Sequence, residues 1–161
     1  MLIRNILEES VRKFDEVKAV KWLKKKEIME RSYGELMENV VSTRKGLLAE
    51  GFEGKHIALI GTSSVEWMES YLGIITGCTT AVPLDAALPC EDLIDLLNRS
   101  DSVALFLSPK LKPYLDAFLE NCPKLQKVWM LQEEVEDAPA KVYGIGELRN
   151  AEIGRASCRE R

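Results

Sequence analysis

Apolar residues occur along the chain in two patterns. Some form the continuous runs that are typical of buried strands, and others recur at the spacing of amphipathic helices. An uninterrupted apolar run at residues 56–60 is typical of a strand that is buried on both faces. Residues 67–75 then carry apolar side chains at helical spacing, after a polar turn at residues 61–64. A second β-prone run covers residues 79–82, and Pro83 ends it because proline cannot donate to a central ladder. A strand, a crossover helix and a second strand predict a βαβ unit in a parallel sheet.

The helix of this central unit carries its own start and stop signals. Ser63 is followed three residues later by Glu66, which predicts a capping box in which each side chain accepts a hydrogen bond from a free amide. Gly77 falls where a helix often ends in a left-handed residue. We therefore expect a helix that begins near Ser63 and ends at Gly77.

Similar patterns predict further elements on both sides of the central unit. They indicate an amphipathic helix over residues 3–14, a hairpin from residues 18–22 and 28–32, a helix from the capping box Ser32–Glu35 to Gly51, a helix from Pro89 to Ser100, a strand over 103–107, a helix over 110–121, a strand over 127–131 and a short helix over 145–150. This succession predicts an α/β fold, with an open, mostly parallel, doubly wound sheet preceded by an N-terminal helix and a β-hairpin.

Composition narrows the class of protein. A length of 161 residues suits one domain or one piece of a larger domain, and a net charge of −4 argues against a nucleic-acid-binding protein. The charged N-terminal pattern is unlike a secretory signal, and no apolar run reaches the roughly 18 residues that a transmembrane helix needs, so we expect a cytoplasmic protein. The cysteines show no C-x-x-C spacing, which favours reduced thiols over a metal or redox site: Cys78, Cys90, Cys122 and Cys158.

Two stretches of the chain have the residue types of an anion-binding site. Residues 61–64, Gly-Thr-Ser-Ser, follow a strand and open a helix, so their amides could hold an anion, but they match neither common phosphate-loop motif and a capping role explains them. Three lysines, Lys24, Lys25 and Lys26, form a basic cluster at the hairpin tip that could contact phosphate or acidic lipid. Solvated lysines are the simpler interpretation.

Single residues give weaker signals. His56 is the only histidine and has no partner at a recognisable catalytic spacing, so a structural role is the favoured interpretation. Asp85 follows Pro83 at a strand end, the edge where α/β sheets bind ligands, but a turn-forming aspartate that bonds its own loop explains it more simply. Glu66 is explained by the predicted capping box. We therefore assign no catalytic, cofactor-binding or metal-binding residue.

The order of short segments identifies a family. Ser32-Tyr33-Gly34-Glu35-Leu36, Gly51–Leu59, Ser64-Val65-Glu66-Trp67, Leu72-Gly73-Ile74 and Val82-Pro83-Leu84-Asp85 follow one another. Over about residues 3–131 this series closely resembles the start of the adenylate-forming (AMP-dependent) synthetase and ligase superfamily, and within it bacterial long-chain fatty-acid–CoA ligases. The departures from the family pattern are small. Lys55-His56 replaces the Asp that is usual where the strand begins, Thr62 replaces a common Asn, and residues 77–80 replace Ala-Gly-Ala-Val.

The resemblance implies an enzyme that activates a fatty acid with ATP and Mg²⁺ through an acyl-adenylate and transfers it to coenzyme A. In the family, the phosphate loop, the adenine-binding segment, the ribose-binding Asp and the late catalytic Lys all lie downstream of the matched region. Residues 1–151 are thus expected to be the N-terminal part of the AMP-binding domain, an incomplete piece that is inactive without the rest of its own chain. Fatty acid, ATP and coenzyme A are the expected partners of the whole enzyme, with no nucleic acid and no transmembrane segment.

Two alternatives stay open. One is another adenylate-forming enzyme, such as an amino-acid adenylating domain. The other is a stand-alone flavodoxin-like nucleotide-binding module. A titration with ATP or FMN would separate these from a scaffold segment of a ligase.

The last ten residues have a different character. Residues 152–161, EIGRASCRER, contain three arginines and two glutamates without periodicity, and they resemble the conceptual translation of a sequencing adapter. We therefore expect residues 152–161 to be a non-native tail that is unpacked or extends a helix incidentally. A natural Arg-rich loop is the alternative.

Overall fold

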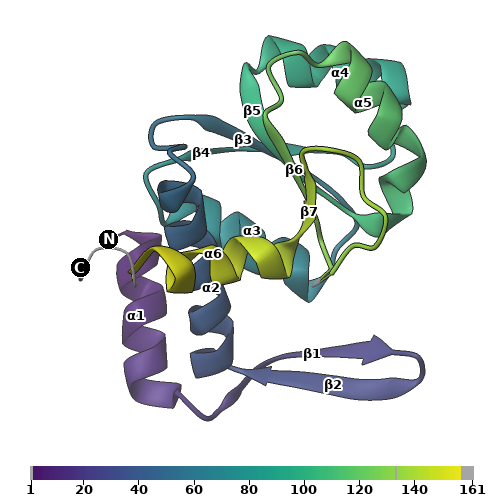
Figure 1. The fold of residues 1–161 in the computed structure, drawn as a ribbon. Helices are drawn as coiled ribbons and strands as arrows, with labels where there is room; N and C mark the ends of the chain where they lie inside the picture. The colour runs from purple at the N-terminus through teal and green to yellow at the C-terminus, as the bar shows by residue number, and fades with distance from the viewer. Residues whose placement is uncertain (1, 133, 157–161) are drawn as a thin grey trace.

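The computed structural model describes residues 2–132 and 134–156, with side chains described as far as residue 150. Helices and strands alternate along most of the chain, and an antiparallel hairpin projects from the body near the N-terminus (Figure 1). The elements are α1 Ile3–Phe14, β1 Lys18–Lys24, β2 Glu27–Ser32, α2 Tyr33–Ala49, β3 His56–Ile60, α3 Val65–Ile75, β4 Thr80–Leu84, α4 Cys90–Arg99, β5 Ser102–Leu107, the 3₁₀ helix η1 Pro109–Tyr114, α5 Leu115–Asn121, β6 Lys127–Met130, β7 Val142–Gly144 and α6 Ile145–Ala156.

The main sheet confirms the predicted α/β class. Its five strands lie in the order β4-β3-β5-β6-β7, and every neighbouring pair is parallel. Counted from β3, this is the order 2-1-3-4-5 of a doubly wound sheet, in which the winding reverses between β3 and β5. The fifth strand, β7, is absent from the sequence prediction because three residues ending in glycine carry too weak a pattern.

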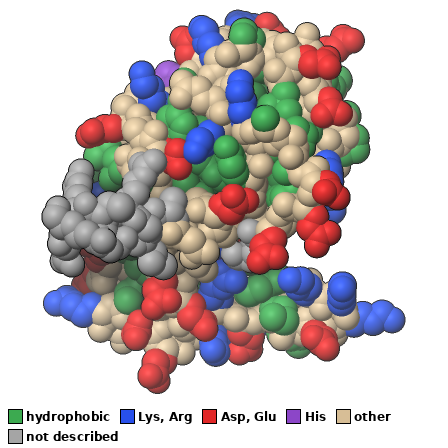
Figure 2. Space-filling view, in the orientation of Figure 1, with side chains coloured by type: hydrophobic (Ala, Val, Ile, Leu, Met, Phe, Trp, Pro, Cys, Tyr) green, Lys and Arg blue, Asp and Glu red, His purple; other side chains and the backbone are tan. Residues whose placement is uncertain are grey.

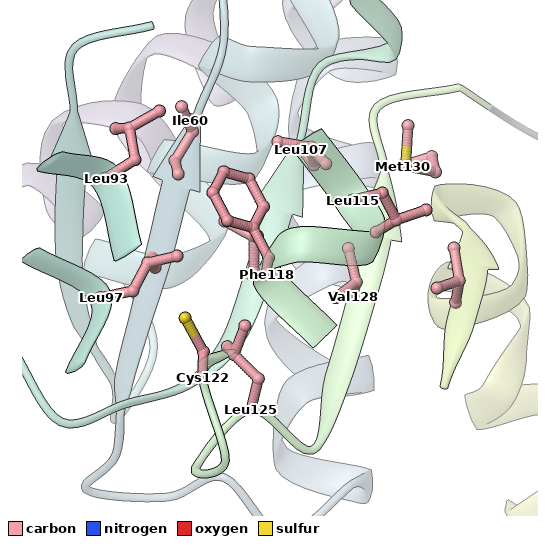
Figure 3. Close-up of a cluster of buried hydrophobic side chains, with 13 residues drawn as sticks. Ile60, Leu93, Leu97, Leu107, Leu115, Phe118, Cys122, Leu125, Val128 and Met130 are labelled. Atoms are coloured by element: carbon pink, nitrogen blue, oxygen red, sulfur yellow. The ribbon is translucent and has the colours of Figure 1, made fainter. Parts of the chain in front are cut away.

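Alternate residues of the central strands fill two separate cores. Ala58 and Ile60 of β3 face one layer, which α4 and α5 cover with Leu93, Leu97 and Phe118 (Figure 3). Ile57 and Leu59 face the other layer, with side chains of α2, α3 and α6. Because both faces of the sheet are covered, the central strands read as continuous apolar runs, which is the pattern that predicted them.

The start of α3 corrects one sequence prediction. The N-cap is Ser64, whose Oγ accepts a hydrogen bond from the Trp67 amide at 3.1 Å. Trp67 rather than Glu66 is therefore the third helical residue, and the predicted capping box of Ser63 and Glu66 is wrong. Two adjacent serines offer the same cap chemistry, so the sequence alone does not distinguish between them.

The end of α3 corrects a second prediction. Gly77 is not left-handed: the described glycines with positive φ are Gly51 and Gly54. A Cβ at Gly77 would lie 3.2 Å from the Cγ of Arg44 and 3.3 Å from the Gly73 carbonyl oxygen. Close packing, rather than backbone conformation, explains this glycine.

Two prolines change the boundaries of neighbouring elements. Pro83 lies inside β4, paired with Leu59, because β4 is the edge strand and one of its sides has no ladder to complete. Pro113 divides the predicted helix over 110–121 into η1 and α5, since proline has no N–H for an α-helix through this point.

The N-terminal elements agree with their predicted bounds but remain largely uncovered. α1 has no buried residue, and Ile3, Ile6 and Phe14 are about half exposed, at 50%, 46% and 49%. The side chain of Arg4 ties the helix to the body by donating to the carbonyl oxygen of Thr76. The capping box of Ser32 and Glu35 at the start of α2 is present as predicted.

The C-terminal helix is longer than expected. α6 begins at Ile145, as predicted, but continues to Ala156 instead of ending near Asn150. The predicted non-native tail therefore starts within a helix, and its last part, residues 157–161, lies outside the described residues. The origin of residues 152–161 stays a prediction.

Candidate functional site

The carboxyl ends of β3 and β4 form the sheet edge where ligands bind in open α/β folds. A hollow of about 520 Å³ lies there, lined by Gly61, Thr62, Ser63, Asp85, Ala86 and Ala87. It brings together the two stretches that the sequence singled out at this edge, the glycine-serine turn and Asp85.

The polar groups of this hollow are mostly engaged in local structure. Ser64 caps α3, and Asp85 accepts a hydrogen bond from the Ala87 amide at 2.9 Å, the turn that the sequence favoured. The exposed hydroxyls of Thr62 and Ser63 remain, with one carboxylate and no Lys or Arg among the lining residues. Because a phosphate needs positive charge or several converging donors, the hollow lacks the chemistry of a nucleotide site.

Ser108 and Trp67 lie against Gly61 at the point where the winding reverses. The Ser108 amide donates to the Ile60 carbonyl oxygen at 2.9 Å, which bridges the ends of β3 and β5. A Cβ at Gly61 would lie 3.0 Å from the Ser108 Cβ and 3.1 Å from the Trp67 Cδ1. A flavin or nucleotide bound as in a flavodoxin-like module would lie at this end of the sheet, where Trp67 and Ser108 leave no room for a side chain at Gly61.

The other residues considered from the sequence lie far from this edge. His56 is at the amino end of β3, and its Nδ1 donates to the Ser100 carbonyl oxygen at 2.6 Å, which ties the strand to the end of α4. Lys24, Lys25 and Lys26 are exposed at the hairpin tip. The structure therefore does not bring the histidine, the lysines and Asp85 together.

The described thiols are not poised for chemistry as a group. Cys78 is exposed, Cys90 is half-buried and Cys122 is buried, and all three are free. Burial raises the pKa of Cys122 to about 11, and the neighbouring Cys90 adds to the effect. Burial also raises the pKa of Cys90. Higher pKa values keep these two thiols protonated and unreactive near neutral pH. The fourth cysteine, Cys158, lies outside the described residues.

A buried ionic cluster is the feature that the sequence analysis missed. Glu69 of α3 is fully buried, and its Oε1 accepts hydrogen bonds from Arg31 of β2 and, at 3.0 Å, from Asn39 of α2. Its Oε2 accepts a hydrogen bond from Arg149 of α6 at 3.0 Å, and Arg149 also donates to Thr43 at 3.2 Å. We call these five residues the Glu69 cluster.

The Glu69 cluster joins four elements that are distant in the sequence. One carboxylate fixes the base of the hairpin, α2, α3 and α6 relative to one another. Both of its oxygens are occupied by protein donors, so the cluster has the character of an internal brace rather than a substrate site. A helical acid within Met68-Glu69-Ser70 gives no sequence signal of burial, and a buried partner arginine 80 residues away cannot be read from spacing.

The hollow at the β3–β4 edge does not fit the cofactors that the resemblance implies. No group of three or more His, Cys, Asp or Glu side chains that could hold a metal ion occurs in the described part of the chain. The only carboxylate in the hollow at the β3–β4 edge bonds its own loop. This hollow therefore offers no set of side chains suited to Mg²⁺ or to the phosphates of ATP.

No helix in the described part of the chain combines the length and apolar character needed to cross a bilayer. A search of curated protein sequences found no match to this chain. The fold, by contrast, has many counterparts among solved structures.

Three of these counterparts are ligases of known structure. A coronafacic acid ligase from Pectobacterium brasiliense superimposes with a TM-score of 0.82 at 20% identity, covering 93% of this chain and 29% of that chain. An anthranilate CoA ligase in complex with anthranoyl-AMP superimposes with a TM-score of 0.75 at 16% identity, covering 91% of this chain and 26% of that chain. A putative long-chain-fatty-acid CoA ligase from Rhodopseudomonas palustris superimposes with a TM-score of 0.77 at 11% identity, covering 92% of this chain and 36% of that chain.

These likenesses establish the fold, and the chain spans only about a quarter to a third of each of those longer chains. The family follows from a sequence model. The model of the AMP-binding enzymes matches residues 7–153, which is most of the 161 residues. The chain belongs to the AMP-binding enzyme family.

Proposed function

We propose that this chain is the N-terminal part of an acid–thiol ligase that activates a long-chain fatty acid and transfers it to coenzyme A. In the first half-reaction a carboxylate oxygen bonds to the α-phosphorus of ATP, and pyrophosphate leaves. In the second, the sulfur of coenzyme A bonds to the acyl carbon, and AMP leaves. The observation that carries the enzyme class is the family match over residues 7–153, and the fatty-acid substrate rests on the resemblance of the short segments described above.

Within that enzyme, residues 2–150 act as a scaffold. Their sheet buries two apolar layers, and the Glu69 cluster fixes the hairpin and three helices around it. The hollow at the β3–β4 edge lacks basic side chains, which agrees with a role that leaves nucleotide binding to other parts of the enzyme. We also propose a cytoplasmic location, in keeping with the charged N-terminal pattern.

The stand-alone nucleotide-binding module is the less favoured alternative. Its strand order would be the same, but the hollow at the β3–β4 edge has no Lys or Arg among its lining residues to bind a phosphate. An amino-acid adenylating domain differs from the proposed ligase in the acceptor of the acyl group, and only the reaction itself separates the two.

The first experiment tests the scaffold role on the 161-residue chain. We expect no release of pyrophosphate with palmitate, ATP and Mg²⁺, and no change of intrinsic fluorescence on titration with ATP or FMN. Turnover comparable to that of an intact ligase would refute the scaffold role. Saturable binding of FMN would favour the stand-alone module.

The second experiment tests the reaction and the origin of residues 152–161. We propose that this segment comes from adapter sequence, so resequencing the source DNA across codon 151 should replace it and extend the reading frame. The extended protein should release pyrophosphate with palmitate only when ATP is present, and form palmitoyl-CoA when coenzyme A is added. Pyrophosphate exchange with amino acids instead of palmitate would identify an adenylating domain and contradict the proposed substrate. The same ten codons in the resequenced DNA would show that the segment is genuine.

A further inference from the structure

The tip of the β1–β2 hairpin exposes an aliphatic pair. Leu23 and Ile28 lie directly opposite each other across the two strands, and 70% and 72% of their surfaces are exposed. They are the most exposed large apolar side chains of the hairpin. Isolated exposed apolar residues are ordinary, but these two form a pair near the tip of a hairpin that projects from the body of the protein (Figure 1).

The same hairpin concentrates positive charge. Residues 18–32 carry six basic and two acidic side chains, a net charge of +4, whereas the whole chain carries −4. The lysines gather at the tip, beside exposed apolar atoms on the lower right of the molecule (Figure 2). A net positive charge on one element of an acidic protein indicates an anionic partner for that element.

The turn itself holds lysine where other residues fit better. Lys25 and Lys26 have φ values of 48° and 71°, the left-handed region that a two-residue hairpin turn requires. Asn-Gly or Asp-Gly satisfies this geometry at lower conformational cost. Two lysines in these positions are therefore poorly explained by the needs of the turn.

The base of the hairpin is held by the body of the protein. Arg31 of β2 pairs with the buried Glu69, and its guanidinium lies 5.4 Å from the ring centroid of Trp22. Trp22 and Arg31 lie on one face of the hairpin, while the register places Leu23 and Ile28 on the opposite face. The tip is thus presented outward on an anchored stem.

We propose that the hairpin tip, residues 23–28, docks on the surface of a lipid bilayer that contains anionic headgroups. Leu23 and Ile28 enter the interfacial region, and Lys24, Lys25 and Lys26 contact the headgroups. A convex tip suits a deformable surface, because a protein partner would have to supply a groove for it. Aliphatic side chains do not stack on bases as aromatic ones do, which disfavours single-stranded nucleic acid. This docking site is independent of the acyl substrate proposed above.

The test is flotation of the 161-residue chain with vesicles in a density gradient, which leaves aggregated protein at the bottom. The vesicles contain either phosphatidylcholine alone or phosphatidylcholine with 30% phosphatidylserine. The tip variant is the triple substitution Lys24→Gln, Lys25→Gln and Lys26→Gln. The control variant, Lys55→Gln, Lys110→Gln and Lys112→Gln, changes the net charge equally at exposed lysines elsewhere. A third variant, Leu23→Ser with Ile28→Ser, tests the apolar pair, and circular dichroism checks that each variant is folded.

We expect the chain to float with the anionic vesicles and not with the neutral ones, and added salt to weaken the binding. Each tip lysine contributes about fivefold to the partition coefficient, so the tip variant should lose on the order of 100-fold while the control variant stays within about threefold of the wild type. The apolar variant should also bind more weakly.

Three results would overturn the proposal. The first is the absence of binding to anionic vesicles by the folded chain. The second is equal loss in the tip and control variants, which would indicate a general charge effect. The third is vesicle binding that does not depend on the tip, together with tip-dependent binding of an oligonucleotide or tip-dependent self-association in sedimentation velocity. That result would assign the tip to nucleic acid or to a second copy of the chain.

Discussion

Substitution of Glu69 by glutamine tests whether the Glu69 cluster braces the fold. Glutamine keeps the shape of the side chain but removes the negative charge that Arg31 and Arg149 share. Arg149 is only 7% exposed, so its guanidinium would lose a buried counterion while it stays largely shielded from water. Arg31 is 21% exposed and can turn toward solvent. The loss of stability should therefore come mainly from Arg149.

Breaking a buried ion pair by removing one partner costs about 3–5 kcal/mol, and the freedom of Arg31 places Glu69→Gln near the lower value, about 3 kcal/mol. Domains of this size have an unfolding free energy of about 5–15 kcal/mol, so the variant should still fold. With a urea m-value of about 2 kcal/mol/M, the expected decrease of the unfolding midpoint is about 1.5 M.

The assay is urea unfolding followed by circular dichroism, and the matched control is Asp95→Asn. That change also removes one acidic charge from a helical ion pair, but Asp95 and Arg99 are 61% and 75% exposed, so the expected loss is below about 0.5 kcal/mol. A double replacement, Glu69→Met with Arg149→Met, should recover most of the stability lost in Glu69→Met alone, because it removes both buried charges. A midpoint shift for Glu69→Gln no larger than that of Asp95→Asn would refute the bracing role.

Three further predictions follow from individual contacts. Gly46→Ala should cost about 1–3 kcal/mol of stability and lower the melting temperature, because its Cβ would lie 2.5 Å from the Leu148 carbonyl oxygen. The control is Glu38→Ala, an exposed position on the same helix, and a stabilised Gly46→Ala would contradict the close packing of α2 on α6. Iodoacetamide at pH 8 followed by mass spectrometry should label the exposed Cys78 and spare Cys122 until the chain is unfolded; labelling of both at equal rates would show that Cys122 is not buried. The pKa of Cys122 rises from 9.0 to about 11 on folding, so its contribution to stability should be present below pH 9 and be lost as the pH rises through 11. Cys122→Ala should therefore flatten that part of the curve of unfolding free energy against pH.

The sequence by itself determined the elements whose signals are local. The capping box at Ser32 needs only Ser32 and Glu35, three residues apart, and it is present in the structure. The apolar runs of β3 and β5 predicted strands covered on both faces, because period and burial are related within a few residues. The family resemblance, carried by short segments in a fixed order, agrees with the family match.

The tertiary structure decided what depends on distant partners. Ser63 and Ser64 are equivalent caps in the sequence, and the structure places the N-cap of α3 at Ser64. Three residues become β7 because β6 offers them a ladder. Glu69 reads as an ordinary helical acid until the hairpin, α2 and α6 enclose it and supply two arginines. Capping and periodicity act between neighbours in the chain, whereas strand order and the burial of charge arise only when remote segments meet.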